Sequence, residues 1–562
     1  MKVGVVLLHT SLAPASGEFG AKAKGVFDTI LPIRGHRTMQ RPGGRQQAAR
    51  KLGVAPSRGG YGRRKSGLGY LVAHPEVVVF GLCLLWLFGC VKLFVNKDDY
   101  QASQMRGGGQ AVQQLLVPPP MPPQKKQAQV IQAQQTPPQK KDQSTEMVPE
   151  HYMAFSTACS SSQNWQSFIF FFYAAKVGQP GKVVRIASGC SQKEQDDLTK
   201  FHLEIISKLS PNFSVHFTPD FAKVSGDNYK YYNKPFGLQH WMEHGLKFAE
   251  NAKTVEDAII VVLDPDMILL RPLTYDFIDS NVMIHASERG PPKVRKVMHG
   301  QPWASLYGFG DGPFRSVDLR HVFTNHTDSP ALLVPKDEQL NNYAGGPPYM
   351  ATGRDMFAIV NVWCELVPSV HHEYKALLGE MYGWSLAAAH LGLPHTLSES
   401  FMISATGMGS GEGWPLIDQL KDDELCEIST LREKEDKLPY VIHYCQSYWL
   451  GKWFIGKYRL DKEFLSCEKP LLLEPPKDIG LKYDFYVKPG GKPYGEKKKI
   501  GLTIAKREQF MICQIIARLN DAATWYKDQT CEKGTANYEK SWIFHHSLDP
   551  DNNDGGEKKT KK

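Results

Sequence analysis

The sequence predicts an α/β fold, in which strands alternate with helices around one sheet. Two observations predict it. From about residue 150, short apolar runs alternate with helix-like stretches, and the most apolar run, Ala258–Leu263 (AIIVVL), ends directly at a pair of carboxylates. Alternation of this kind gives a sheet with right-handed crossover connections, and ligands of such sheets bind beyond the ends of the strands.

The individual elements follow from local patterns in chain order. Strand-like runs lie at Tyr152–Thr157, Val183–Ala187 and Ala258–Leu263, and helix-like stretches at Trp165–Lys176, Pro235–Ala249, Arg354–Leu366 and Tyr382–His390, with a turn at Gly178–Gly181. Beyond about residue 476 the chain is rich in Lys and Gly, apart from an amphipathic stretch at Gln509–Trp525. We therefore divide the folded part into a main domain, 150–476, and a C-terminal extension, 477–562.

The positive charge of the chain lies almost entirely at its N-terminal end. The formal net charge is +9, and residues 1–76 contain 13 Lys and Arg residues against three acidic ones. The remaining residues are nearly neutral, so the sequence does not predict a basic surface on the folded part. Nucleic-acid binding is therefore disfavoured.

An apolar segment follows the basic tail. Residues 77–95 (VVVFGLCLLWLFGCVKLFV) contain one charge, Lys92, and at about 1.5 Å per residue they are long enough to cross a bilayer. The Lys/Arg-rich tail before this span predicts a cytosolic N-terminus and a lumenal remainder. Residues 96–149 are rich in Gln, Pro and Lys and predict an extended stem. This layout is typical of a single-pass type II membrane enzyme of the Golgi or the ER.

The strongest chemical signal is Asp264-Pro265-Asp266 at the end of the apolar run. Two carboxylates at such a turn can bind Mg²⁺ or Mn²⁺, which bridges to phosphate oxygens of a substrate. The same letters recur at Leu548–Asp551, but no strand precedes that copy. The context, rather than the Asp-x-Asp letters, therefore predicts the metal site, with a plain surface turn as the alternative.

Other motifs carry weaker signals. His443, in the strand-like run Tyr440–Tyr444, is the candidate third metal ligand, and a hydrogen-bonded buried histidine is the alternative. The Gly-rich segments Gly308–Gly312 and Gly407–Gly413 predict flexible loops, since neither joins a strand to a helix. The His371-His372 pair is expected at a solvated helix end.

Ordered blocks between about residues 152 and 475 resemble the plant and algal peptidyl serine α-galactosyltransferases and the related hydroxyproline O-arabinosyltransferases. The blocks are FSTAC, NWQ, GQPGKVVRIASGC, YNKPFGLQHWMEH (232–244), VVLDPDMILLRP, GQPWASLYGFG (300–310), GEMYGWSLAAAHLGL (379–393), VIHY (441–444) and LLEPP (472–476). The segments LDPDM, NKP with HW, and EMYGWS are nearer to the serine galactosyltransferase branch.

The resemblance implies a GT-A-like, Rossmann-like nucleotide-sugar-binding domain with a UDP-sugar donor. It also implies Mn²⁺ (or Mg²⁺) as cofactor and a Ser or hydroxyproline hydroxyl of a secreted or cell-wall glycoprotein as acceptor. Both branches are expected to retain the anomeric configuration, and we favour a front-face displacement that depends on positioning and electrostatics.

The resemblance also assigns roles to individual residues. Asp264, Asp266 and His443 match the metal ligands, and Glu380 matches a contact to the sugar or the acceptor. We assign catalysis to Asp264, Asp266 and Glu380. The donor-binding candidates from the matched blocks are Thr157, Asn233, Lys234, Trp241 and Arg271. For Asn233, Lys234 and Trp241 the alternative is helix capping and core packing, and for Glu380 it is a helix start.

Three other functions remain open from the sequence. The first is a hydroxyproline O-arabinosyltransferase. The second is a non-catalytic, membrane-anchored protein that binds glycoproteins, and the third is a structural cell-surface protein with a Pro/Gln stalk. The two non-enzymatic functions predict that no UDP-sugar is turned over.

Overall fold

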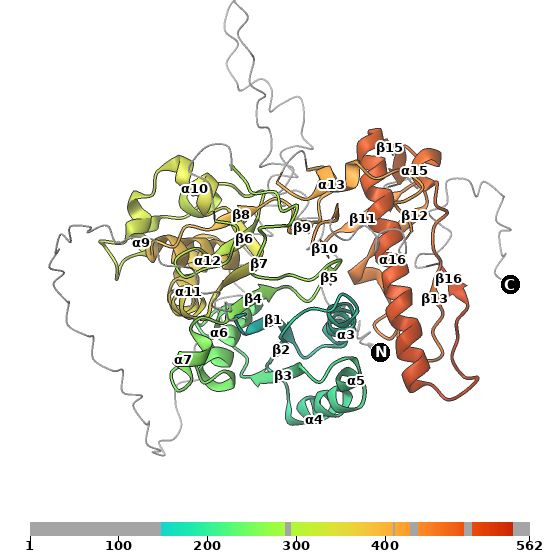
Figure 1. Ribbon diagram of the computed structural model, residues 1–562, viewed down its shortest axis with the longest axis horizontal. Helices are drawn as coiled ribbons and strands as arrows, with labels where there is room; N and C mark the ends of the chain where they lie inside the picture. Colours follow the sequence, from blue (N-terminus) through green and yellow to red (C-terminus); the bar gives the residue numbers. More distant parts are fainter. Residues whose placement is uncertain (1–147, 287–293, 409–410, 428–436, 488–496, 543–562) are drawn as a thin grey trace, which may run out of the picture. The chain divides into compact units, whose positions relative to one another are not determined.

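The computed structural model of the 562-residue chain describes residues 148–286, 294–408, 411–427, 437–487 and 497–542 (Figure 1). The predicted cytosolic tail, the span at 77–95, nearly all of the stem and the second Asp-Pro-Asp copy lie outside these residues. Among the helices within the described ranges, none combines the length and the apolarity needed to cross a bilayer.

A mixed seven-stranded sheet forms the centre of the fold, which confirms the α/β class. Its order is β3-β2-β1-β4-β7-β6-β8, with β1 (His151–Ala158), β2 (Lys182–Ser188), β3 (Phe213–Thr218), β4 (Ile259–Leu263), β6 (Trp303–Leu306), β7 (Gly345–Thr352) and β8 (Thr396–Ser398). The first four strands are parallel, and β7 runs antiparallel to β4 and β6. The order 3-2-1-4 is also that of the first four strands of a Rossmann fold. The three predicted strands are thus confirmed as β1, β2 and β4.

Helices cover both sides of the parallel strands. Figure 1 shows β1 and β2 between α3 (Ser161–Lys176) and α6 (Asn233–His240), and both helices contact these two strands. The turn predicted after α3 is confirmed. It needs glycine at residue 181, where φ is +78° and a Cβ atom would lie 2.0 Å from the carbonyl oxygen of His151.

The remaining predicted helices are confirmed with different bounds. The stretch predicted over 235–249 is shorter: α6 passes into a π-helical turn, η3 (Trp241–Gly245), and the helix ends there. The helices predicted at 354–366 and 382–390 are longer than predicted and form α11 (Gly353–Glu373) and α12 (Gly379–His390). The Thr352 hydroxyl caps the N-terminus of α11. At the end of α11, His372 is exposed as predicted, but His371 is buried against the ring of Tyr229.

Several short helices connect these elements. They are α4 (Gln192–Phe201), η1 (His202–Ile206), α5 (Ser207–Leu209), η2 (Lys230–Tyr232), α7 (Ala252–Val255), α8 (Gly312–Arg315), α9 (Leu319–Val322), η4 (Pro330–Leu333), α10 (Lys336–Asn342), α13 (Trp414–Asp418), η6 (Lys457–Arg459) and α15 (Ile479–Lys482). The prediction of a flexible loop at Gly407–Gly413 is wrong at Glu412, which the structure holds in place. Its carboxylate is buried and accepts hydrogen bonds from Ser404 and Trp414, which fix this part of the loop.

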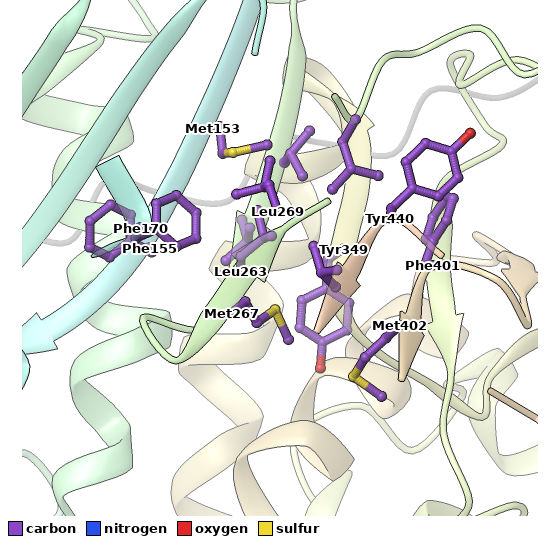
Figure 2. Close-up of a cluster of buried hydrophobic side chains, with 14 of the residues drawn as sticks. Met153, Phe155, Phe170, Leu263, Met267, Leu269, Tyr349, Phe401, Met402 and Tyr440 are labelled. Atoms are coloured by element: carbon purple, nitrogen blue, oxygen red, sulfur yellow. The ribbon is translucent and has the colours of Figure 1, made fainter. Parts of the chain in front are cut away.

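A second sheet lies against the first, with the order β5-β10-β9. Its strands are β5 (Met267–Leu269), β9 (Met402–Ile403) and β10 (Val441–His443). Figure 2 shows Met267 and Met402 from this sheet beside Tyr349 of β7, in one apolar cluster with Leu263 of β4. The two sheets therefore share a hydrophobic core. The two-stranded pairs are β11 (Ser447–Leu450) with β12 (Trp453–Gly456), β13 (Leu471–Leu472) with β16 (Lys540–Ser541), and β14 (Phe485–Val487) with β15 (Lys497–Lys499).

The amphipathic helix predicted over 509–525 is confirmed as the longer α16 (Leu502–Thr530). Its apolar residues join the same core as the sheets. Disulfides Cys426–Cys513 and Cys467–Cys531 bind it to earlier segments, and a third, Cys159–Cys190, joins the segments that follow β1 and β2. The division of the chain at residue 476 stays a prediction, although α16 packs within the main core.

Candidate functional site

The turn Asp264-Pro265-Asp266 lies where the chain passes from one sheet to the other. It joins β4 of the large sheet to β5 of the small one, so the apolar strands on either side bury the turn. In β1, Phe155 pairs with Leu263, the last residue of β4. The carboxyl ends of these parallel strands, where α/β folds bind ligands, therefore lie beside both carboxylates.

The register between β5 and β10 brings His443 to the same place. His443 pairs with Met267, and its Nε2 atom lies 3.4 Å from Oδ1 of Asp266 and 3.9 Å from Oδ2 of Asp264. On the other side of the ring, Nδ1 lies 3.4 Å from the hydroxyl of Tyr307. These contacts fix the orientation of the imidazole toward the two carboxylates.

Together, the three side chains form a set of ligand atoms that could hold a divalent cation. Asp264, Asp266 and His443 each offer one ligand atom, and these atoms all lie within 4.8 Å of one another. Asp266 and His443 are buried, and Asp264 is half-buried. Two carboxylate oxygens and one imidazole nitrogen fit Mn²⁺, and Mg²⁺ less well, because Mg²⁺ prefers oxygen ligands.

Two lysines pair with the two carboxylates. The ammonium group of Lys457, at the start of η6, pairs with Oδ2 of Asp266. The ammonium group of Lys234, on α6, lies 2.6 Å from Oδ1 of Asp264 and 3.3 Å from the carboxylate of Glu380. Both lysine side chains are only 12% exposed, so little solvent screens these charges.

Glu380 is held at this site by the first turn of α12. Its backbone N–H donates to the hydroxyl of Tyr229, and its carbonyl accepts from the indole N–H of Trp363. Burial raises the pKa of the Glu380 carboxyl to about 7, although Lys234 opposes the shift. This carboxyl can therefore take up or release a proton near neutral pH.

The surroundings shift the pKa values of the two buried metal-ligand candidates in opposite directions. Burial alone would raise the pKa of Asp266, but Lys457 and His443 hold it well below its usual range. Burial would likewise lower the pKa of His443, but Cys445 and Asp266 raise it above its usual range. In this arrangement Asp266 is a carboxylate and His443 carries a proton, which a metal ion would have to displace.

Two of the other predicted donor-site residues, Asn233 and Trp241, make their side-chain contacts outside this charged cluster. Asn233 holds the preceding loop, since its side-chain amide donates to Asp220 and accepts from the backbone of Phe221. Trp241 packs edge-on against Tyr152 in the core. The core-packing alternative thus describes Trp241, whereas Asn233 neither caps the helix, as the other alternative had it, nor faces the cluster, but holds a loop.

Thr157 and Arg271 lie at different ends of their strands. Thr157 is on the same sheet edge as Asp264, one strand away, and its hydroxyl accepts a hydrogen bond from buried Arg185. Arg271 lies beyond the far end of β5, with its guanidinium 3.6 Å from the centre of the Tyr440 ring. The structure therefore brings together Asp264, Asp266, His443, Lys234 and Glu380, but not Arg271.

Sequence reasoning missed Lys457, Tyr307 and Arg185. Lys457 and Tyr307 lie far from the Asp-x-Asp turn in sequence, and no motif links them to it. The pairing of strands brings them close to the turn in the fold. Arg185 does carry a signal, since it is the single charge within the apolar run Val183–Ala187. Its guanidinium donates to Thr157 and Asn164, and burial lowers its pKa to about 9.

Sequence comparison finds two plant and algal relatives of this chain. No protein-family model matches it. The peptidyl serine α-galactosyltransferase of Arabidopsis thaliana is 25% identical over 277 residues, which are 47% of this chain and 28% of that protein. The Chlamydomonas reinhardtii protein of the same name is 24% identical over 330 residues, 58% of this chain and 38% of that protein. The chain thus spans about a third of the length of these relatives, and the resemblance seen in the ordered blocks is confirmed.

Comparison with solved structures gives weaker likenesses. The galactosyltransferase LgtC, in complex with donor and acceptor sugar analogues, has a TM-score of 0.28 at 9% identity, covering 52% of this chain and 87% of that one. The apo structure of the bifunctional glycosyltransferase WbbM has a TM-score of 0.27 at 11% identity, covering 54% and 46%. Such scores are too low to assign a fold, and the α/β class rests on the sheet itself.

Proposed function

We propose that this protein is a retaining, metal-dependent glycosyltransferase that moves a sugar, with galactose favoured, from a UDP-sugar to serine or hydroxyproline hydroxyls of secreted glycoproteins. The observation that carries the proposal is the buried cluster of Asp264, Asp266 and His443 at the carboxyl edge of the parallel strands. The relatives named above support a serine acceptor and galactose. A GT-A-like fold is part of the same proposal.

The side chains of the cluster have distinct roles in the proposed reaction. Asp264, Asp266 and His443 would hold Mn²⁺ (or Mg²⁺), which as a Lewis acid supplies stabilisation of the negative charge on the leaving diphosphate. Lys457 and Lys234 place two further positive charges at the carboxylates, where phosphate oxygens would bind. Their fixed positions stabilise the developing charge without reorganisation.

Glu380 has the second role, toward the sugar or the acceptor. Its carboxyl is buried and pairs with Lys234, which also pairs with Asp264. With a pKa of about 7, this carboxyl can either donate a hydrogen bond to a hydroxyl group or accept one from it. We favour a front-face displacement in which Glu380 positions a hydroxyl and forms no bond to the sugar. Mass-spectrometric trapping of a glycosyl adduct on Glu380 would overturn this mechanism.

The function is tested with the full-length chain, a panel of UDP-sugars and a serine-containing acceptor peptide, in Mn²⁺ or EDTA. We expect turnover of one donor, its loss in EDTA, and its loss in Asp266→Ala. The second Asp-Pro-Asp copy offers a matched control, because Asp551→Ala changes the same letters outside the cluster and should keep full activity. Absence of both UDP-sugar turnover and UDP binding would favour a non-catalytic glycoprotein-binding protein.

The acceptor and the alternative sugar are separated by the same assay. Turnover of UDP-arabinose with a hydroxyproline peptide, in place of UDP-galactose with a serine peptide, would instead identify a hydroxyproline O-arabinosyltransferase. The nearer likeness of the sequence blocks to the serine branch favours the first donor and acceptor.

We further propose a single-pass type II protein of the Golgi or ER membrane with a lumenal catalytic domain. The apolar segment 77–95 after a basic tail and three disulfides in the described chain support this location. Asn212 and Asn325 both head Asn-x-Ser/Thr sequences and are exposed. A glycosidase-sensitive mass shift that disappears in Asn212→Gln/Asn325→Gln would place them in the lumen, whereas an absent shift with cytosolic protease sensitivity would refute the orientation.

A further inference from the structure

A second cluster of metal-ligand side chains lies at the carboxyl end of α11. His372 and Glu373 are the last two residues of this helix, and His321 comes from the short helix α9. Nδ1 of His321 lies 2.5 Å and Nδ1 of His372 lies 3.4 Å from the same oxygen, Oε1 of Glu373. One ligand atom from each residue lies within 4.8 Å of the other two.

The surroundings of these three residues favour a cation. The exposed side chains of His321 and His372 are reachable from solvent, with exposures of 52% and 69%. Unpaired carbonyl groups also give the end of a 21-residue helix a partial negative charge, which stabilises positive ions.

We propose that His321, His372 and Glu373 form a second metal site, which takes Zn²⁺ or a similar borderline divalent cation. Two imidazoles and one carboxylate match the ligand types of three-ligand zinc sites, in which water fills the remaining position. The cluster around Asp266 offers two carboxylates and one imidazole, and so favours harder ions. The second site shares no residue with it and does not rest on the proposed transferase activity.

A metal ion here would connect two segments that are distant in sequence. It would bind α9 to the end of α11, one residue from buried His371, whose ring stacks on Tyr229 at 3.7 Å. The hydroxyl of Tyr229 in turn accepts the backbone N–H of Glu380 at 3.1 Å. Zinc at this position would therefore stabilise the segment that leads from α11 to Glu380.

The test is isothermal titration of the full-length chain with Zn²⁺ in the presence of saturating Mn²⁺, which is added to fill the proposed metal site at Asp266. We expect one Zn²⁺ per chain and a rise in thermal midpoint on binding. Loss of an outer-sphere partner alone weakens a metal site by about 10–100-fold, so His321→Ala and His372→Ala should each weaken zinc binding at least about tenfold and abolish the rise. His299→Ala is the matched control, since His299 is an exposed histidine paired with one carboxylate, Asp355.

The outcomes are unambiguous because each variant is first checked for an unchanged circular dichroism spectrum. If either histidine variant is misfolded, Glu373→Gln, which keeps the shape of the side chain, takes its place. Stoichiometric zinc binding that falls in these variants and persists in His299→Ala supports the site. Absence of stoichiometric binding, or equal affinity in all variants, would overturn it. Repeating the titration with Asp266→Asn separates the sites, since the second site should keep its zinc there.

Discussion

The two halves of the candidate site differ in how the chain builds them. Asp264, Asp266 and Lys234 come from the parallel half of the sheet, where β1 to β4 and their helices follow one another closely in sequence. Glu380, His443 and Lys457 come from the second half, where pairing joins segments far apart in sequence. The first half can be read from local patterns, whereas the second depends on topology.

Charged side chains of each half find ion-pair partners in the other half. Asp266 of the first half is buried against Lys457 of the second, and Lys234 of the first half lies against Glu380 of the second. Separating the halves would leave buried charges without partners, which costs several kcal/mol for each pair. The site charges therefore couple the two halves, and the following changes test that coupling in order of expected effect.

The largest effect is expected for Asp266→Ala, which removes a ligand candidate of the first half. Loss of metal-assisted charge stabilisation should reduce turnover by about 10³-fold or more, or at least about 4 kcal/mol in the barrier. The measurement is the rate of UDP release under saturating donor, with Asp266→Asn as the conservative variant. A rate within about twofold of the parent chain, which is the result expected for Asp551→Ala, would exclude Asp266 from catalysis.

The next largest effect is expected for Lys457→Met, which removes the cation of the second half. Because Asp266 is then buried without this partner, the free energy of unfolding should fall by about 3–5 kcal/mol. Urea denaturation in EDTA measures it, with the exposed Lys462→Met as control. Asp266→Asn/Lys457→Met should recover part of the loss. No recovery in the double variant would mean that the charge pair does not cause the destabilisation.

A smaller, pH-dependent effect is expected from Glu380. Its raised pKa means that the native state binds more protons than the unfolded state between about pH 4.5 and 7, so this group lowers stability as pH rises through that window. The total change amounts to roughly 2–3 kcal/mol. Urea midpoints measured across this range should show the slope flatten in Glu380→Gln but persist in Glu338→Gln, an exposed residue of α10. An unchanged slope in Glu380→Gln would contradict the assignment.

The smallest effect concerns the disulfides of the two halves. Cys159–Cys190 spans 31 residues in the first half and Cys426–Cys513 spans 87 in the second. Because the entropy of the unfolded chain rises with loop length, replacing the longer bridge by serines should cost about 1 kcal/mol more. Thermal unfolding of the two double-serine variants checks the order. The reverse order would show that native contacts, rather than loop length, set the difference.

The same contrast explains what could be predicted from the sequence. Strand β4 is an uninterrupted apolar run, and β1 and β2 are mainly apolar. The position of Asp264 and Asp266 follows from the end of β4. By contrast, β7 reads GGPPYMAT, and its two glycines and two prolines hide a buried strand. Without β7, the arrangement of the second half cannot be derived, although motif resemblance still identified Glu380 and His443.

The remaining errors have local physical causes. The helix predicted over 235–249 ends early, at Gly245, because the backbone leaves the helical region and reaches a φ of +51° at Lys247. Glycine is needed at 245, where a Cβ atom would lie 2.5 Å from the ring of Trp241. Asn233 and Trp241 belong to the matched blocks, but their side chains serve the loop and the core. Lys457 was missed because only three-dimensional proximity to Asp266 distinguishes it from other lysines.

The disulfides that join α16 to earlier segments also fix when, during synthesis, these bonds can form. Ribosomes deliver the chain from its N-terminus, and the partners of Cys426 and Cys467 lie at positions 513 and 531. Both bridges therefore stay open until residues 513 and 531 have been synthesised. The segment that carries His443 and Lys457 lies between Cys426 and Cys467, so the two disulfides that flank it form only after this segment itself has been translated.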